Sequence, residues 1–258
     1  MSHSTALHRL AAAALLVLLV ACAHDPESRS AVASESPMPA ALADWSLREL
    51  PGKAPTRYSG AERAGRACVL AQASRSVSLW RRPLELPSGA NAGELDAVQF
   101  DWWIGLQEPR ASIADPQTDD AAARLVLGFD GDASRLSVRN RMQFELIQTL
   151  TGETPPFATL MYVWDAQAQP ESLFVSQRSD RIRKIVVGSG PAMDGRWQRL
   201  RRDVRADYQR AFGEAPGRLI SMAMMTDADN TASRTEACYG DILLLDAENR
   251  TLPGSLLF

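Results

Sequence analysis

The chain has 258 residues, with 28 lysines and arginines against 31 aspartates and glutamates and a formal net charge of −3. This balance, without any basic run interleaved with aromatic residues, argues against nucleic acid as a partner. All three histidines, His3, His8 and His24, precede Asp25, so the rest of the chain excludes Ser-His-Asp and Cys-His catalysis in their usual forms and zinc sites built on histidine.

The first segment predicts secretion and attachment to a membrane. Arg9 and the free amino terminus precede an uncharged, apolar run at residues 10–21, which leads into the pattern Val20-Ala21-Cys22. The run is shorter than the roughly 20 apolar residues that span a bilayer, and its layout is typical of a bacterial signal peptide with a lipobox. We expect removal of residues 1–21 and lipidation of Cys22. The alternative is a plain secretory signal in which Cys22 is incidental.

Residues 22–43 predict a flexible tether that begins with the lipidated cysteine, and residues 44–258 predict one domain. The tether is rich in Ala, Ser, Pro and charged residues, so it lacks the apolar area that ordering requires. Ala23 follows the cysteine, and the sorting rule of enteric bacteria then directs the protein to the outer membrane. We therefore expect a bacterial cell-envelope protein on the outer membrane, facing the periplasm, with the lipid anchor as its contact with the membrane.

Short apolar runs separated by turn residues predict a series of β-strands. In residues 98–106, Phe100, Trp102 and Ile104 lie on one face, which is the period-two pattern of a half-buried strand. The strands are expected at residues 66–73, 77–84, 98–106, 122–129, 160–164, 182–187, 197–204, 219–225 and 239–245.

Two segments among these strands predict helices. Residues 140–150 place Met142, Leu146, Ile147 and Leu150 on one face, ahead of a stop at Gly152. The other helix is expected at residues 203–212, which precede Gly213. The whole pattern predicts a mainly β protein, a single antiparallel β-sandwich of the jelly-roll type with one or two short helices.

Two cysteines remain after Cys22, and they leave two interpretations open. Cys68 and Cys238 are too few for a structural zinc site. In an oxidising envelope they could form one disulfide that closes a long loop. The alternative is two separately buried thiols, because the sequence does not set the distance between them.

Several segments, taken in order, resemble a known family. They are Phe100-Asp101-Trp102-Trp103, residues 119–130, Tyr162-Val163-Trp164-Asp165, residues 181–187, residues 202–213, residues 225–231 and Tyr239-Gly240-Asp241-Ile242. In kind and order they resemble the domain of unknown function 3047 (DUF3047) family of bacterial envelope proteins, over roughly residues 45–245. The resemblance assigns no chemistry, but it implies a fold similar to the galactose-binding-like jelly rolls of carbohydrate-binding modules. Residues 139–152 are longer and more helical than the loop that the family pattern implies there.

An acid-rich loop suggests calcium as a possible structural ion. Asp227, Asp229 and Asn230 lie in this loop, Asp241 lies on the strand that follows it, and hard cations prefer such oxygen ligands. The alternative is a loop in which these side chains bind their own backbone. A second acidic set flanks the strand at 122–129: Asp119, Asp120, Asp130 and Asp132.

Aromatic residues and one arginine are the candidates for ligand binding. Trp102 and Trp103 point to opposite faces of a regular strand, so one belongs to the core and the other is a candidate platform for a sugar ring. Trp164 raises the same question, and core packing is the competing interpretation for each tryptophan. Arg124 is a candidate for a polar patch beside them.

No catalytic residue is assigned from the sequence. Carboxylate pairs for glycoside cleavage lie about 5–10 Å apart, and Asp101, Glu145, Asp165 and Glu236 are available; Tyr162 and Tyr239 are the least implausible bases for a lyase. We expect first a non-catalytic module that binds a glycan or another envelope ligand. The alternatives are an assembly protein that binds another envelope protein, and a polysaccharide hydrolase or lyase.

Overall fold

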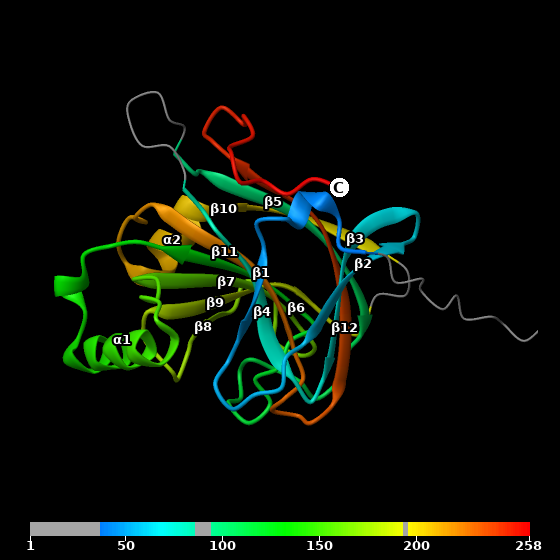
Figure 1. Ribbon diagram of the computed structural model, residues 1–258, viewed down its shortest axis with the longest axis horizontal. Helices are drawn as coiled ribbons and strands as arrows, with labels where there is room; N and C mark the ends of the chain where they lie inside the picture. Colours follow the sequence, from blue (N-terminus) through cyan, green and yellow to red (C-terminus); the bar gives the residue numbers. More distant parts are fainter. Residues whose placement is uncertain (1–36, 86–93, 193–195) are drawn as a thin grey trace, which may run out of the picture. The chain divides into compact units, whose positions relative to one another are not determined.

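Figure 1 shows a computed structural model of the chain, which describes residues 37–85, 94–192 and 196–258. All of these residues belong to one unit, residues 33–258. The predicted signal peptide, Cys22 and most of the predicted tether lie outside the described residues. Within the described part of the chain, no helix is both long enough and apolar enough to cross a bilayer.

Two β-sheets form the body of this unit. In spatial order, the larger sheet contains β1 (Ser46–Glu49), β4 (Val77–Pro83), β11 (Leu219–Asp227), β6 (Ala123–Phe129), β7 (Ala158–Asp165), β9 (Ile182–Ser189) and β8 (Leu173–Val175). The smaller sheet contains β10 (Trp197–Asp203), β5 (Ala97–Leu106), β12 (Arg234–Leu245), β3 (Arg66–Ser74) and β2 (Arg57–Arg63). All neighbouring strands are antiparallel except β7 and β9, which run parallel.

The core lies between the two sheets because each strand turns alternate apolar side chains inward. On β5 these are Phe100, Trp102 and Ile104, and on the facing sheet Leu125 and Leu127 of β6 join the same buried cluster. The Phe100 ring stacks on Tyr162 of β7, with ring centroids 5.8 Å apart. The prediction of a mainly β sandwich is confirmed.

Three strands carry too little pattern to be predicted. β1 and β8 have four and three residues and lie at the two edges of the larger sheet. β2 reads RYSGAER, a run of small and polar residues at the edge of the smaller sheet. An edge strand pairs on one side only, so backbone hydrogen bonds to its neighbour hold it without an alternating apolar face.

The helices differ in how they attach. α2 (Val204–Phe212) begins at its N-cap Asp203, ends at Gly213, and buries Tyr208 against Phe129 with ring centroids 4.9 Å apart. α1 (Val138–Thr151) begins at Ser137 and ends at Gly152, whose φ of 74° is the left-handed conformation that glycine favours. Among its residues only Asn140 is buried. Two short 3₁₀ turns, η1 (Ala40–Leu42) and η2 (Ala133–Arg135), complete the fold.

A disulfide ties two strands of the smaller sheet. Cys68 of β3 and Cys238 of β12 are bonded, with Cα atoms 5.7 Å apart and 170 positions between them in the sequence. Both residues are fully buried. Of the two interpretations that the sequence left open, the structure has the bonded one.

Replacing both cysteines by alanine is expected to lower the free energy of unfolding by about 3–5 kcal/mol, because the disulfide restricts the unfolded chain over a long loop. Urea denaturation of the wild type and of Cys68→Ala/Cys238→Ala measures the change. Wild-type stability that does not respond to a reducing agent, together with an unchanged double variant, would contradict the pairing.

Candidate functional site

The larger sheet carries a groove on its outer face, away from the core. The floor of the groove is formed by side chains that alternate with the core residues on four strands. These are Leu79 on β4, Ala223 and Met225 on β11, Val126 on β6, and Met161 on β7. The groove has a volume of about 420 Å³, within the range of ligand sites. We call it the sheet groove.

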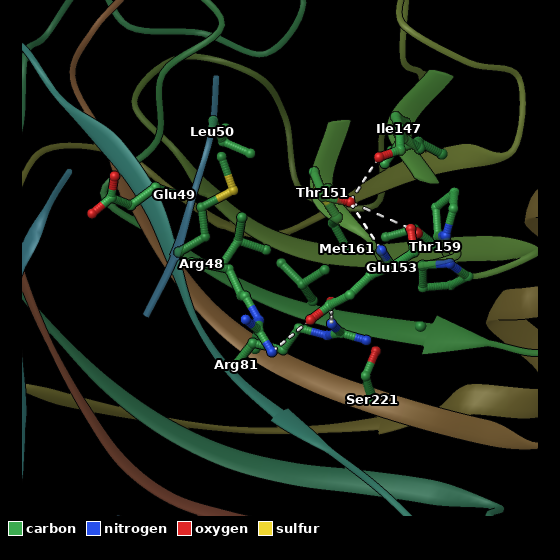
Figure 2. Close-up of a pocket in the computed structure, with 18 of the residues that line it drawn as sticks. Arg48, Glu49, Leu50, Arg81, Ile147, Thr151, Glu153, Thr159, Met161 and Ser221 are labelled. Atoms are coloured by element: carbon green, nitrogen blue, oxygen red, sulfur yellow. Dashed lines mark hydrogen bonds and ion pairs between the residues drawn. The ribbon is translucent and has the colours of Figure 1, made fainter. Parts of the chain in front are cut away.

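Polar side chains line the walls of the sheet groove, as Figure 2 shows. Glu153, which follows α1, reaches across to Arg48 of β1 at 2.7 Å and to Arg81 of β4 at 2.8 Å. This acid therefore links the segment after α1 to the far edge of the sheet. Gly128 lets Pro156 lie against the floor, because a Cβ there would come within 2.7 Å of the proline ring.

A second cavity of about 210 Å³ adjoins the sheet groove. The two share Met161, Arg178, Ile182 and Met225 as lining residues, so they lie side by side. We call the second cavity the charged pocket and the two together the outer-face cleft. Arg178 is exposed where they meet, and its guanidinium makes no ion pair within the described ranges.

Arg124 of β6 is the centre of the charged pocket. Its side chain is 3% exposed, and Nη2 lies 2.9 Å from the Asp227 carboxylate and 3.2 Å from that of Asp119. Lys184 of β9 also binds Asp119. The Arg124 Nε is buried without a hydrogen-bond partner among the described atoms.

Burial changes the proton affinities in the charged pocket. Desolvation raises the pKa of Asp227 to about 7, with Arg124 opposing the shift and the nearby Asp120 and Asp119 adding to it. Burial and the neighbouring Arg124 lower the pKa of the Lys184 ammonium. Asp227 is therefore a group that can gain or lose a proton near neutral pH.

The structure brings together only some of the residues predicted to bind calcium. Asp227 and Asp229 gather with Asp120, with their carboxylate oxygens within 4.8 Å of one another. Asp241 does not belong to this group, because it lies on β12 in the other sheet and accepts the backbone N–H of Phe258. Asn230 donates its side-chain amide to the carbonyl of Pro116.

The acidic group already has protein partners. Asp229 lies 2.5 Å from the Lys53 ammonium, and Asp120 accepts the backbone N–H groups of Asn230 and Thr231. A calcium ion would have to displace the cations at Asp229 and Asp227, so calcium stays a prediction. The acids at the end of β11 bind groups of neighbouring segments, Lys53, Arg124 and the backbone N–H of Ala121, rather than the backbone of their own loop.

The tryptophan predictions need correction. Trp102 is fully buried and Trp164 is 4% exposed, both in the core between the sheets, so neither reaches an external ligand. Trp103 points to the opposite face, as expected, but it is half-buried beneath Arg63, whose guanidinium carbon lies 5.5 Å from the ring centre. Among the described residues, none that lines the outer-face cleft is aromatic. Of the predicted ligand-binding residues, only Arg124 lines it.

The candidate catalytic groups do not converge. Asp101 pairs with Arg66 and Arg199 on the smaller sheet, and Asp165 accepts backbone N–H groups at the end of β7. Glu145 lies on α1 and Glu236 on β12. Tyr162 and Tyr239 are buried in the core, where desolvation raises the pKa of each well above its usual value, so neither is suited to act as a base.

Sequence reasoning missed the lysine and the methionines of the cleft. Lys184 stands inside the apolar run IRKIVV, and a charge at that position is a signal for a buried partner. Met161 and Met225 lie on strands that were predicted. Their outward direction gave no signal because both faces of those strands are apolar.

Comparison with known proteins gives one match. A family model described as "Protein of unknown function (DUF3047)" matches residues 43–243. No curated protein matches the chain.

Asp227→Asn is expected to change the pH dependence of stability. The folded protein keeps the Asp227 proton up to about pH 7, whereas the unfolded chain releases it near pH 4. Because the folded state then binds more protons, this residue makes stability fall as the pH rises through that window, by at most about 4 kcal/mol. Urea denaturation at several pH values measures the free energy of unfolding of the wild type and of the variant. Between pH 4 and pH 7, the variant should lose less of this free energy than the wild type.

Asp132→Asn is the matched control. Hydrogen bonds from Ser134 lower the pKa of Asp132, so its contribution has the opposite sign and is lost as the pH falls. Parallel wild-type and Asp227→Asn curves between pH 4 and pH 7 would contradict the raised pKa.

Proposed function

Because this chain belongs to the DUF3047 family, whose description assigns no activity, we propose a function from the site itself. The protein is a lipid-anchored envelope protein. It binds an extended ligand in the outer-face cleft and does not react with it. The observation that carries the proposal is an apolar-floored groove beside a pocket that holds a buried guanidinium. Ligand sites combine these two features, an apolar lining and a few fixed polar groups.

The side chains that line the cleft indicate how it would bind a ligand. Its floor is aliphatic and methionine-rich, so it can contact the C–H faces of a sugar or an acyl chain but provides no ring for stacking. Arg178 is exposed and available to donate hydrogen bonds to hydroxyl or carbonyl oxygens. A glycan held by hydrogen bonds along one edge is the ligand class that we favour.

The envelope location has two supports. The lipobox at Cys22 predicts an anchored protein. The disulfide between Cys68 and Cys238 suits an oxidising compartment such as the periplasm. We propose the outer membrane, facing the periplasm, as the place of attachment.

Blocking the sheet groove tests the ligand proposal. Ile147 of α1 lines the groove and is 41% exposed, so Ile147→Trp should fill the groove without disturbing the core. Thermal unfolding is measured against a panel of envelope glycans and acyl compounds. A ligand at a hundredfold excess over its Kd adds about 2.7 kcal/mol to the stability of the wild type, a shift of several degrees, and Ile147→Trp should abolish this shift.

Leu150→Trp is the matched control, because Leu150 lies on the same helix but does not line the groove. It should keep the ligand-induced shift. The proposal is wrong if no compound of the panel stabilises the wild type, or if both variants respond as the wild type does.

One observation favours hydrolysis as a second candidate function. Asp119 and Asp227 both contact Nη2 of Arg124, so these two carboxylate oxygens lie no more than about 6 Å apart, the scale of a retaining glycosidase pair. The pKa of Asp227 is about 7, so at neutral pH this carboxyl group can either donate or accept a proton. Release of reducing ends from envelope polysaccharide by the wild type, and its loss in Asp227→Asn, would favour this function over binding alone.

A further inference from the structure

α1 carries an apolar stripe on the face that points away from the sandwich. Val138, Met142, Leu146 and Leu150 follow one another at intervals of four residues, and they are 71%, 65%, 58% and 65% exposed. Residues four apart lie on one side of a helix. We call these four residues the α1 stripe. Figure 1 shows α1 beside β8 and β9 at the margin of the sandwich.

The stripe cannot turn inward, because the opposite side of α1 is already attached. Asn140 donates to the Asp180 carboxylate at 2.5 Å and accepts the Ser179 hydroxyl at 2.9 Å. Phe144, on the same side as Asn140, packs against the core. The exposed position of the stripe is therefore fixed by polar contacts made on its other face.

Two basic residues lie at the start of α1, beside the stripe. Arg139 and Arg141 are exposed on α1 itself, and Arg139 donates to the carbonyl of Gln177. Within α1 the only acidic residue is Glu145. An exposed apolar stripe with arginines beside it can meet the interface of an anionic membrane through both its apolar side chains and its positive charges.

The size of the stripe argues against a second copy of the chain as its partner. Four half-exposed to mostly exposed aliphatic side chains offer on the order of 450 Å², whereas a stable dimer buries about 800 Å² on each partner. A patch of this size still marks a surface that meets something apolar. A bilayer is the partner that fits this area, because a lipid anchor would already hold the protein at the membrane. The stripe then needs to add only a small binding free energy to that of the anchor.

We propose that α1 is a second membrane contact, with the α1 stripe inserted at the interface of a bilayer rich in anionic phospholipid. The proposal rests on the envelope location proposed above. Fully extended, the roughly 20 residues between Cys22 and Leu42 span at most about 70 Å, more than the width of about 45 Å of a compact domain of this length. The anchor therefore leaves α1 free to reach the membrane that holds the protein.

A fluorescent probe on α1 tests this contact. The full chain with Leu146→Cys, labelled with an environment-sensitive dye, is added to vesicles of phosphatidylcholine with or without phosphatidylglycerol. We expect the emission to shift to shorter wavelength and to be quenched by spin-labelled lipid, more strongly with phosphatidylglycerol. The same dye at Glu248→Cys, an exposed position on the turn after β12, should show neither effect.

Two further variants separate insertion from simple charge effects. Adding Met142→Glu to the labelled chain should abolish the shift, because a carboxylate replaces a side chain that enters the apolar layer. Gln148→Glu introduces the same charge on an exposed flank of the helix and should keep the shift.

The outcomes distinguish this inference from the proposed function. Flotation with vesicles and incorporation of labelled palmitate report on the anchor, and ligand-induced stabilisation reports on the cleft, whereas only the dye reports on α1. No shift at position 146 overturns the inference, whether or not the chain floats. A shift that appears without vesicles and grows with protein concentration also overturns it, because it would assign the stripe to a second copy.

Discussion

Arg124 places a positive charge inside the protein, and the surrounding loops are arranged to neutralise it. An unpaired buried guanidinium would cost several kcal/mol, and Asp119 and Asp227 both contact this one. These acids come from the segment before β6 and from the end of β11. Asp120, next to Asp119, then fixes the loop that follows β11 through the backbone of Asn230 and Thr231. One charge thus links two loops beside the charged pocket.

The elements that the sequence predicts are those with their own repeating pattern. β5 alternates large apolar residues with others, and α2 spaces Val204, Tyr208 and Phe212 by four, so both could be predicted within a few residues. The charged pocket could not, because Asp119 and Lys184 are 65 positions apart and only the sheet topology brings them together. Likewise, alternation sets Trp102 and Trp103 on opposite faces but does not say which face is the core.

The two helices show what the spacing of apolar residues predicts and what it does not. Both have apolar residues on one side, yet α2 buries Tyr208 in the core whereas α1 turns Met142 and Leu146 to solvent. The difference lies in what the other side of each helix contacts. Asn140 of α1 binds Asp180 and Ser179, and these polar contacts set the orientation of the helix. A hydrophobic pattern therefore specifies a helix and its face, but not the partner of that face.

The disulfide has a consequence for a chain that is cut by a protease. The bond joins residue 68 to residue 238, so most of the sandwich lies within a single covalent loop. A protease that cuts this loop once leaves every strand connected to every other through either the backbone or the sulfur bridge. The two fragments remain at the high effective concentration of one molecule, and the cut chain can retain its two sheets.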